Sequence, residues 1–216
     1  MGFRIIDAAK EKVKFIPKEA SAGMKTQIKL DSVKGKGARV ALAEMLNFFD
    51  KDINGTLEGD ELKALYKVVG ESISVKEVAD VLIKKSTKGE FTEKLHAVSA
   101  MGHLGTVTDE VVPALIDAVK RDSDILCCGA ASSLGIIGEK ARPAVPALAA
   151  KLKDETVAEE AYSSITFALA VIIPKTNRTK EEESAVKLIN EIAGDKNHVF
   201  QDYAKKAQKL MNQKKK

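Results

Sequence analysis

A run of oxygen-bearing residues between Asp50 and Glu61 is the strongest chemical pattern in the chain. Counted from Asp50, side-chain oxygens fall at positions 1, 3, 5, 9 and 12, and Gly55 stands at position 6. A hard cation such as Ca²⁺ takes about six to eight oxygen ligands, and this spacing supplies them from one tight turn. Glycine allows the positive φ that folds the chain around the ion. The pattern therefore predicts one Ca²⁺ site. Its predicted ligands are Asp50, Asp52, Asn54, Thr56 through its carbonyl, Glu58 directly or through water, and Glu61 with both carboxylate oxygens.

Helices must hold this loop, and apolar residues with helical spacing stand on both sides of it. They are Leu42, Met45, Leu46 and Phe49 before the loop, and Leu62, Leu65, Tyr66 and Val69 after it. This spacing predicts a helix, a loop and a second helix. The segment resembles an EF-hand, and the resemblance covers all three parts. The alternative is an acidic surface loop between two helices.

Residues 84–95 resemble a second EF-hand loop that has lost its metal site. Gly89 falls at position 6 and Phe91 at position 8, but lysines and Leu95 occupy ligand positions. EF-hands usually come in pairs, so the resemblance implies that Leu57 and Phe91 lie side by side in a short pair of strands. The alternative is an ordinary helical hairpin after a single hand.

From Leu95 onward the sequence repeats with a period of 33 residues. The matching positions are Ala97 and Ala130, Met101 and Leu134, Gly102 and Gly135, Gly105 and Gly138, and residues 112–115 and 145–148. A period of this length indicates a solenoid of helix pairs. We expect a looser third unit over 161–192, with an insertion at 174–183, and a last helix over 198–211. This half resembles HEAT-type repeats, in the short variety seen in phycobilisome lyases, which implies a protein-binding surface.

These patterns predict an all-α protein in which an EF-hand pair precedes an α-α superhelix. We expect an N-terminal helix and basic arm over 1–36, the EF-hand pair over 37–94, and HEAT-like repeats with a C-terminal capping helix over 95–216. Within the first segment, apolar spacing predicts a helix over 3–16 that ends before Pro17.

Charge is unevenly distributed along the 216 residues, whose formal net charge is +4. Residues 1–39 carry +6 and residues 195–216 carry +5, so the part between them is acidic. The basic ends could contact an acidic partner, or they could simply favour solubility. We expect no specific nucleic-acid surface, because basic residues are not interleaved with aromatic ones. No apolar run reaches the length of a membrane span.

The two cysteines, Cys127 and Cys128, are adjacent, so a disulfide between them is not expected. This usage is typical of a reducing, intracellular and cytoplasmic protein. Both cysteines fall in an apolar run and are expected to pack as small core residues. Tyr162 and Phe167 are also expected in the core.

The sequence contains no Ser/His/Asp set, Cys/His pair or glycine-rich nucleotide loop, and we do not expect an enzyme. His96 and His103 share one helical face with Glu93. They are about 10 Å apart along that helix, too far to bind one small ion together. His198 is expected beside a helix start.

The sequence as a whole predicts a calcium-binding scaffold for protein partners, in which one Ca²⁺ modulates or stabilises the HEAT-like surface. Because Leu95 belongs both to the second loop and to the first repeat, a movement at the calcium loop could pass rigidly into the repeats. One alternative is a structural subunit of a larger assembly with permanently bound Ca²⁺. Another is a HEAT-type chromophore lyase.

Overall fold

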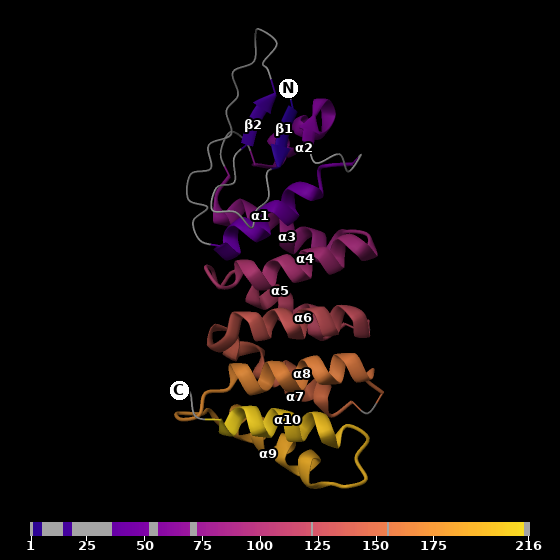
Figure 1. The fold of residues 1–216 in the computed structure, drawn as a ribbon, viewed down its shortest axis with the longest axis vertical. Helices are drawn as coiled ribbons and strands as arrows, with labels where there is room; N and C mark the ends of the chain where they lie inside the picture. Colours follow the sequence, from indigo (N-terminus) through magenta and orange to yellow (C-terminus); the bar gives the residue numbers. More distant parts are fainter. Residues whose placement is uncertain are drawn as a thin grey trace. The chain divides into compact units, whose positions relative to one another are not determined.

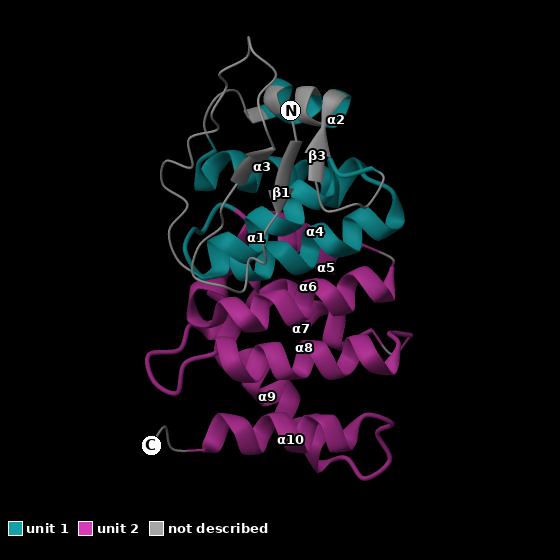
Figure 2. Ribbon diagram, turned by 45° about the horizontal axis from the view of Figure 1, so that its top comes forward, with its two compact units in different colours: residues 1–110 teal, residues 111–216 magenta. Residues whose placement is uncertain are grey.

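The computed structural model describes residues 2–5, 15–18, 36–51, 56–69, 73–121, 123–154 and 156–213 (Figure 1). For residues 2–5, 15–18, 56–59, 62, 63, 66 and 69 it describes the backbone alone. Most described residues are helical, which confirms the expected helical class, and three short strands accompany the helices. None of the described helices is long and apolar enough to span a membrane. The chain divides into two compact units, residues 1–110 and 111–216 (Figure 2).

The described part of unit 1 contains four helices with an apolar core between them and a small antiparallel sheet. The elements are β1 (Gly2–Ile5), β2 (Phe15–Lys18), α1 (Lys36–Asn47), β3 (Thr56–Glu58), α2 (Gly59–Val69), α3 (Val75–Lys88) and α4 (Phe91–Leu104). Helices α1, α3 and α4 pack against one another, while α2 contacts β3 and α3. The predicted apolar stripe of α1 faces this core, since Leu42, Met45 and Leu46 are fully buried. The capping box of Ser74 and Glu77 fixes the start of α3.

The predicted helix over residues 3–16 is wrong at both ends, where the structure has strands β1 and β2. The two strands pair antiparallel, with Phe3 opposite Pro17, and the sheet order is β2-β1-β3. Pro17 therefore lies on an edge strand, where the missing N–H of proline is tolerated. Residues 6–14 and the predicted arm at 19–35 lie outside the described residues.

The predicted pairing of Leu57 with Phe91 is also wrong. Leu57 lies in β3, whose partner is β1, opposite Phe3. Phe91 is the first residue of α4, and only Gly89 and Glu90 separate that helix from α3. Residues 84–95 thus form a tight helical hairpin, which was the alternative to a second hand. The capping box of Glu90 and Glu93 supports this turn, because it satisfies amide groups at the start of α4.

Over the described residues of unit 2 there are six α-helices and one 3₁₀-helix. They are α5 (Val112–Val119), α6 (Asp124–Ile137), η1 (Gly138–Ala144), α7 (Val145–Leu152), α8 (Glu159–Ile172), α9 (Lys180–Gly194) and α10 (Gln201–Asn212). The helix boundaries follow the period seen in the sequence: α6 begins and ends 33 residues after α4, and α7 does so after α5. Proline lies in the first turn of both α5 and α7, where a missing N–H costs nothing. Gly138 ends α6 with φ of 71°, a conformation that favours glycine.

The helices of unit 2 form two layers, one of α6, α8 and α10 and one of α5, α7 and α9 (Figure 1). Small residues bring the helices of the first layer close together. A Cβ atom on Gly135 of α6 would lie 3.5 Å from the Cα atom of Ala168 in α8. Ala130, Ala131 and Ala161 are fully buried. The layers therefore enclose a continuous apolar core, as stacked helix pairs require.

The insertion before α9 is fixed by a salt bridge that the sequence did not reveal. The Arg142 guanidinium donates from Nε and Nη2 to the two carboxylate oxygens of Glu182, at 2.6 and 2.8 Å. Its Nη2 also donates to the carbonyl of Asn177, in the inserted loop. Glu182 is 2% exposed and forms a capping box with Thr179 at the start of α9. The hydrogen bonds from Arg142 lower the pKa of Glu182.

We expect Glu182→Gln to lower the free energy of unfolding by about 1–3 kcal/mol, because it leaves Arg142 without its charged partner. Since the pKa of Glu182 is lowered by folding, its contribution is present above the unfolded pKa and is lost as pH falls through the folded one. The variant should therefore lose less stability than the parent on acidification. Urea unfolding at several pH values measures both effects. Glu183→Gln, on the adjacent exposed residue, should leave the curve unchanged, and an equal loss there would contradict the assignment.

We expect Gly37→Ala to destabilise unit 1 by about 1–3 kcal/mol, because there is no room for a methyl group. A Cβ atom at this position of α1 would lie 2.2 Å from the carbonyl oxygen of His103, at the end of α4. Gly194→Ala is the matched control, since nothing lies within 4 Å of its added Cβ atom. Thermal unfolding followed by circular dichroism compares the two variants. Equal midpoints would show that α1 and α4 do not approach this closely.

Candidate calcium loop and neighbouring surfaces

The structure brings the two ends of the predicted calcium loop together. Two backbone hydrogen bonds, from Phe48 and Phe49 to the last turn of α1, set the direction of the chain into the loop. Asp50, at position 1, is only 8% exposed. Glu61, at position 12, lies in the first turn of α2, and its Oε1 accepts the N–H of Lys51 at 2.6 Å. The last predicted ligand therefore lies at the start of the loop, as coordination of one ion requires.

The other predicted ligands are only partly described. Thr56 and Glu58 lie in β3, and their backbones pair with Arg4 and Gly2 of β1. Asp52 and Asn54 lie outside the described residues. Over the part of the chain that is described, no cluster of three or more His, Cys, Asp or Glu residues could hold a metal. The donors that are placed are oxygens, which suit Ca²⁺ or Mg²⁺ rather than a softer ion.

Lys85 connects the residues just before the predicted calcium loop to helix α4. Its Nζ lies 5.5 Å above the ring centroid of Phe48, within the range of a cation–π contact. The same Nζ pairs with the carboxylate of Glu93, in the first turn of α4. Hydrogen bonding to Lys85 lowers the pKa of Glu93. This residue thus joins the end of α1, the end of α3 and the start of α4.

Among the residues that the structure describes, the histidines belong to no cluster that could hold a metal. His96 is exposed, and its Nδ1 lies 3.6 Å from the carboxylate of Glu44 on α1. Glu93, the third member of that predicted face, is paired with Lys85. His198 lies just before α10, and its Nδ1 accepts the N–H of Phe200.

The two cysteines are free and differ in environment. Cys127 is fully buried, and this burial raises the pKa of its thiol to about 11. Cys128 is partly exposed, with its Sγ 3.2 Å from the Ser164 hydroxyl, which also lies 3.3 Å from the Ser132 hydroxyl. The prediction of buried packing is therefore confirmed for Cys127 and wrong for Cys128. Among the described residues, neither thiol is hydrogen-bonded to a base that would activate it as a nucleophile.

Tyr162 is in the core, as predicted, but its hydroxyl has no hydrogen-bond partner in the described part of the chain. The ring stacks on Phe200 at a centroid distance of 4.1 Å. Both residues line a cavity of about 340 Å³ with Leu152 and the turn over 195–199. Burial raises the pKa of the phenol to about 12, so it stays neutral.

The prediction that Phe167 is in the core is wrong, because its side chain is 54% exposed on α8. The predicted last helix over 198–211 starts too early, since Val199 is 88% exposed and precedes α10. Both errors arise where apolar side chains continue the helical spacing onto a face that no described helix covers.

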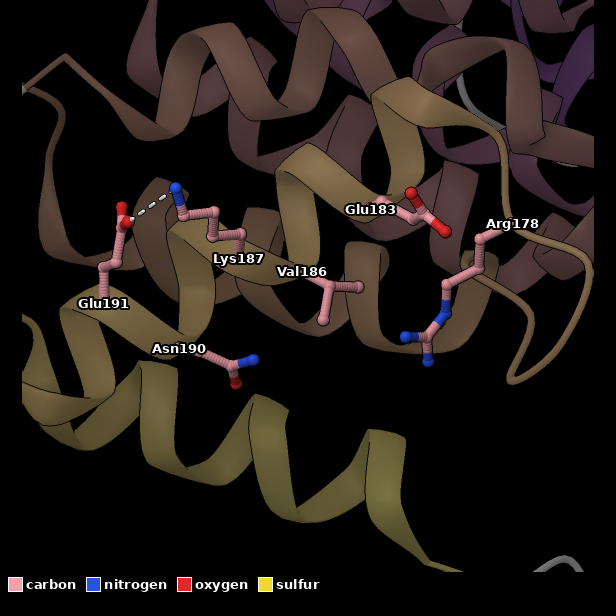
Figure 3. A pocket seen from close by; sticks show the side chains of 6 residues that line it. All are labelled: Arg178, Glu183, Val186, Lys187, Asn190 and Glu191. Atoms are coloured by element: carbon pink, nitrogen blue, oxygen red, sulfur yellow. Dashed lines mark ion pairs between the residues drawn. The ribbon is translucent and has the colours of Figure 1, made fainter.

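A further surface, on α9, is open and carries side chains of both charges. Its cavity of about 420 Å³ is lined by Arg178, Glu183, Val186, Lys187, Asn190 and Glu191 (Figure 3). The Lys187–Glu191 pair shown there is an exposed contact one helical turn apart. Such pairs contribute little, and alternating charges do not select a ligand.

No known protein-family model matches the chain, and a search of curated proteins finds no match either. The assignment of function therefore depends on the residues and their geometry.

We expect Tyr162→Phe to keep or raise the free energy of unfolding, because it removes a buried hydroxyl that has no partner. Tyr203→Phe is the matched change, since that hydroxyl donates to Glu159 at 2.5 Å. It should lower the free energy of unfolding, because it removes a hydrogen bond that is made. Urea unfolding of both variants makes the comparison. A loss of more than about 1 kcal/mol for Tyr162→Phe would mean that this hydroxyl has a stabilising partner.

Proposed function

We propose that this protein is a non-enzymatic, calcium-binding scaffold for protein partners, with one Ca²⁺ in the loop from Asp50 to Glu61. The main support is the position of Glu61, whose carboxylate accepts the Lys51 N–H at the opposite end of the loop. The chain must fold back across ten residues to make this contact, which is the closure that a calcium loop of this length needs. The proposed ligands are Asp50, Asp52, Asn54, Thr56, Glu58 and Glu61.

The proposal includes a route by which the ion would affect the repeats. Helix α1 precedes the loop and packs against α4, the helix with which the 33-residue pattern begins. Lys85 contacts both Phe48 at the loop and Glu93 on α4. A shift of the loop on binding Ca²⁺ would therefore reach α4 through one side chain and one helix interface. A calcium switch requires such a local change, coupled to an element that has two arrangements.

The proposed partner surface is the layer of α6, α8 and α10. It carries three large apolar side chains that are half exposed: Ile125, Ile136 and Phe167. Exposed apolar residues gathered on one face mark interaction sites more often than scattered ones do. HEAT-like helix repeats would present such a surface to other proteins. The intracellular location stays a prediction that rests on the two free cysteines.

A permanently bound structural Ca²⁺ is the second candidate function, and the burial of Asp50 favours it. A preformed, rigid site binds tightly and changes shape little when filled. The two candidates therefore differ in affinity and in the response of α4. The chromophore-lyase alternative has no support among the described residues.

We expect Ca²⁺ to slow amide exchange over residues 85–104 in the parent, because a filled loop would restrain Phe48 and hence Lys85 and Glu93. Glu61→Gln should weaken Ca²⁺ binding at least about tenfold and abolish the effect. Asp60→Asn makes the same charge change at an exposed neighbour and should keep both binding and protection. Exchange measured by mass spectrometry, with Ca²⁺ and with chelator, provides the comparison.

Lys85→Met separates binding from coupling. This variant keeps the aliphatic stem and removes the charge, so it should bind Ca²⁺ as the parent does but lose most of the protection in α4. Binding without protection in the parent itself would favour the structural site. Equal protection in Lys85→Met and parent would contradict the proposed route.

A further inference from the structure

A groove between α8 and α10 has an apolar floor and lies on the proposed partner surface. Its cavity is about 340 Å³ and is lined by residues of both helices. Thr166 and Ala207, in its floor, are 2% and 3% exposed. The Thr166 hydroxyl donates to carbonyls of its own helix, those of Tyr162 and Ser163. The floor therefore leaves no polar group that needs a partner, and an apolar side chain can fill it.

The wall of the groove on α8 is formed by Phe167. This side chain is 54% exposed, and its ring lies against Gly135 of α6, since an added Cβ there would be 3.6 Å from Phe167 Cδ1. Ile136, which follows Gly135 on α6, is 51% exposed. The opposite wall includes Leu210 of α10, which is partly exposed. An apolar surface thus extends from the groove onto α6.

The two charged side chains that line the groove, Lys206 and Lys209, are both positive and come from α10. Neither forms an ion pair with a carboxylate of the described residues. The Nζ of Lys206 lies 5.2 Å over the ring centroid of Tyr203, which holds the ammonium beside the groove. Lys205, by contrast, binds Gln201 and Asp202 on its own helix.

We propose that this groove binds an acidic amphipathic helix of a partner protein, an inference that rests on the proposed scaffold function. One or two apolar side chains of that helix enter the cavity between Phe167 and Leu210. Carboxylates one turn apart on the same helix meet Lys206 and Lys209, which are themselves about one turn apart. Such helices bind through apolar anchors spaced three and four residues apart. The lysines select an acidic partner and speed its association.

The test is binding of a fluorescein-labelled helical peptide of about 16 residues, with Leu and Phe on one face and Glu beside them. A matched peptide has Gln in place of Glu. Fluorescence anisotropy is measured for the full chain in chelator, at low and at high salt. We expect micromolar binding of the acidic peptide, weakened by salt, and weaker binding of the Gln peptide. Because the groove lies in unit 2 and Ca²⁺ is absent, failure of the calcium proposal would not affect this result.

Three variants locate the site. The double change Lys206→Glu with Lys209→Glu should weaken binding at least about tenfold and remove most of its salt dependence. Phe167→Ser should weaken binding and leave the salt dependence in place. Lys205→Glu makes the same charge change beside the groove and should stay within about twofold of the parent. Thermal unfolding of each variant verifies that it is folded.

Several results would overturn the proposal. One is no binding of the acidic peptide by the folded parent. Another is equal weakening by Lys205→Glu and by the groove variants, which would show a general charge attraction. A third is binding of anionic phosphatidylserine vesicles through the same residues with no binding of peptide. A fourth is self-association of the chain that Phe167→Ser abolishes, because a second copy would then occupy the groove.

Discussion

The contact between the Glu61 carboxylate and the Lys51 N–H is the interaction on which the account of this protein depends. Without it, the residues from Asp50 to Glu61 are an acidic connection between two helices. With it, the first and last predicted ligands lie at the same end of the loop. A hard cation needs six to eight oxygens around one point, and only a chain that returns to its start can supply them from about twelve residues. Helix α1 is fixed against α3 and α4, so the loop begins from a rigid base.

The helix pairs of unit 2 depend on stacking, because a single pair that is rich in small residues buries little apolar surface. Gly135 and the buried alanines of α6 and α8 allow these helices to approach closely. Each helix pair then buries its apolar side chains against the next pair. The outer face of these helices keeps some exposed apolar side chains, such as Phe167. The proposed scaffold function assigns that face to partners.

Periodic features were predictable from the sequence. The apolar spacing of Leu42, Met45 and Leu46 located α1, and the 33-residue period located the boundaries of α6 and α7. The cap at Ser74 also follows a local rule, because a hydroxyl and a carboxylate three residues apart satisfy amide groups without help from the rest of the fold. Within the candidate site, the closure by Glu61 agrees with the ligand spacing.

Contacts between residues far apart in the sequence were not predictable. Leu57 pairs with β1 rather than with residue 91, because a strand forms with whichever edge is available and the choice depends on the whole chain. The bond from Arg142 to Glu182 spans 40 residues, and many charged pairs in the sequence could have formed instead. The role of Lys85 has the same origin, since its two partners come from different parts of the chain. The exposure of Phe167 was not predictable either, because apolar spacing identifies a helix but not which of its faces other elements cover.

Calorimetric titration of the purified protein with Ca²⁺ tests the central claim most directly. The account predicts uptake of one Ca²⁺ per chain, with a dissociation constant in or below the range of about 10⁻⁷–10⁻⁵ M that EF-hand sensors show. No binding heat and no spectroscopic change up to millimolar Ca²⁺ would contradict it.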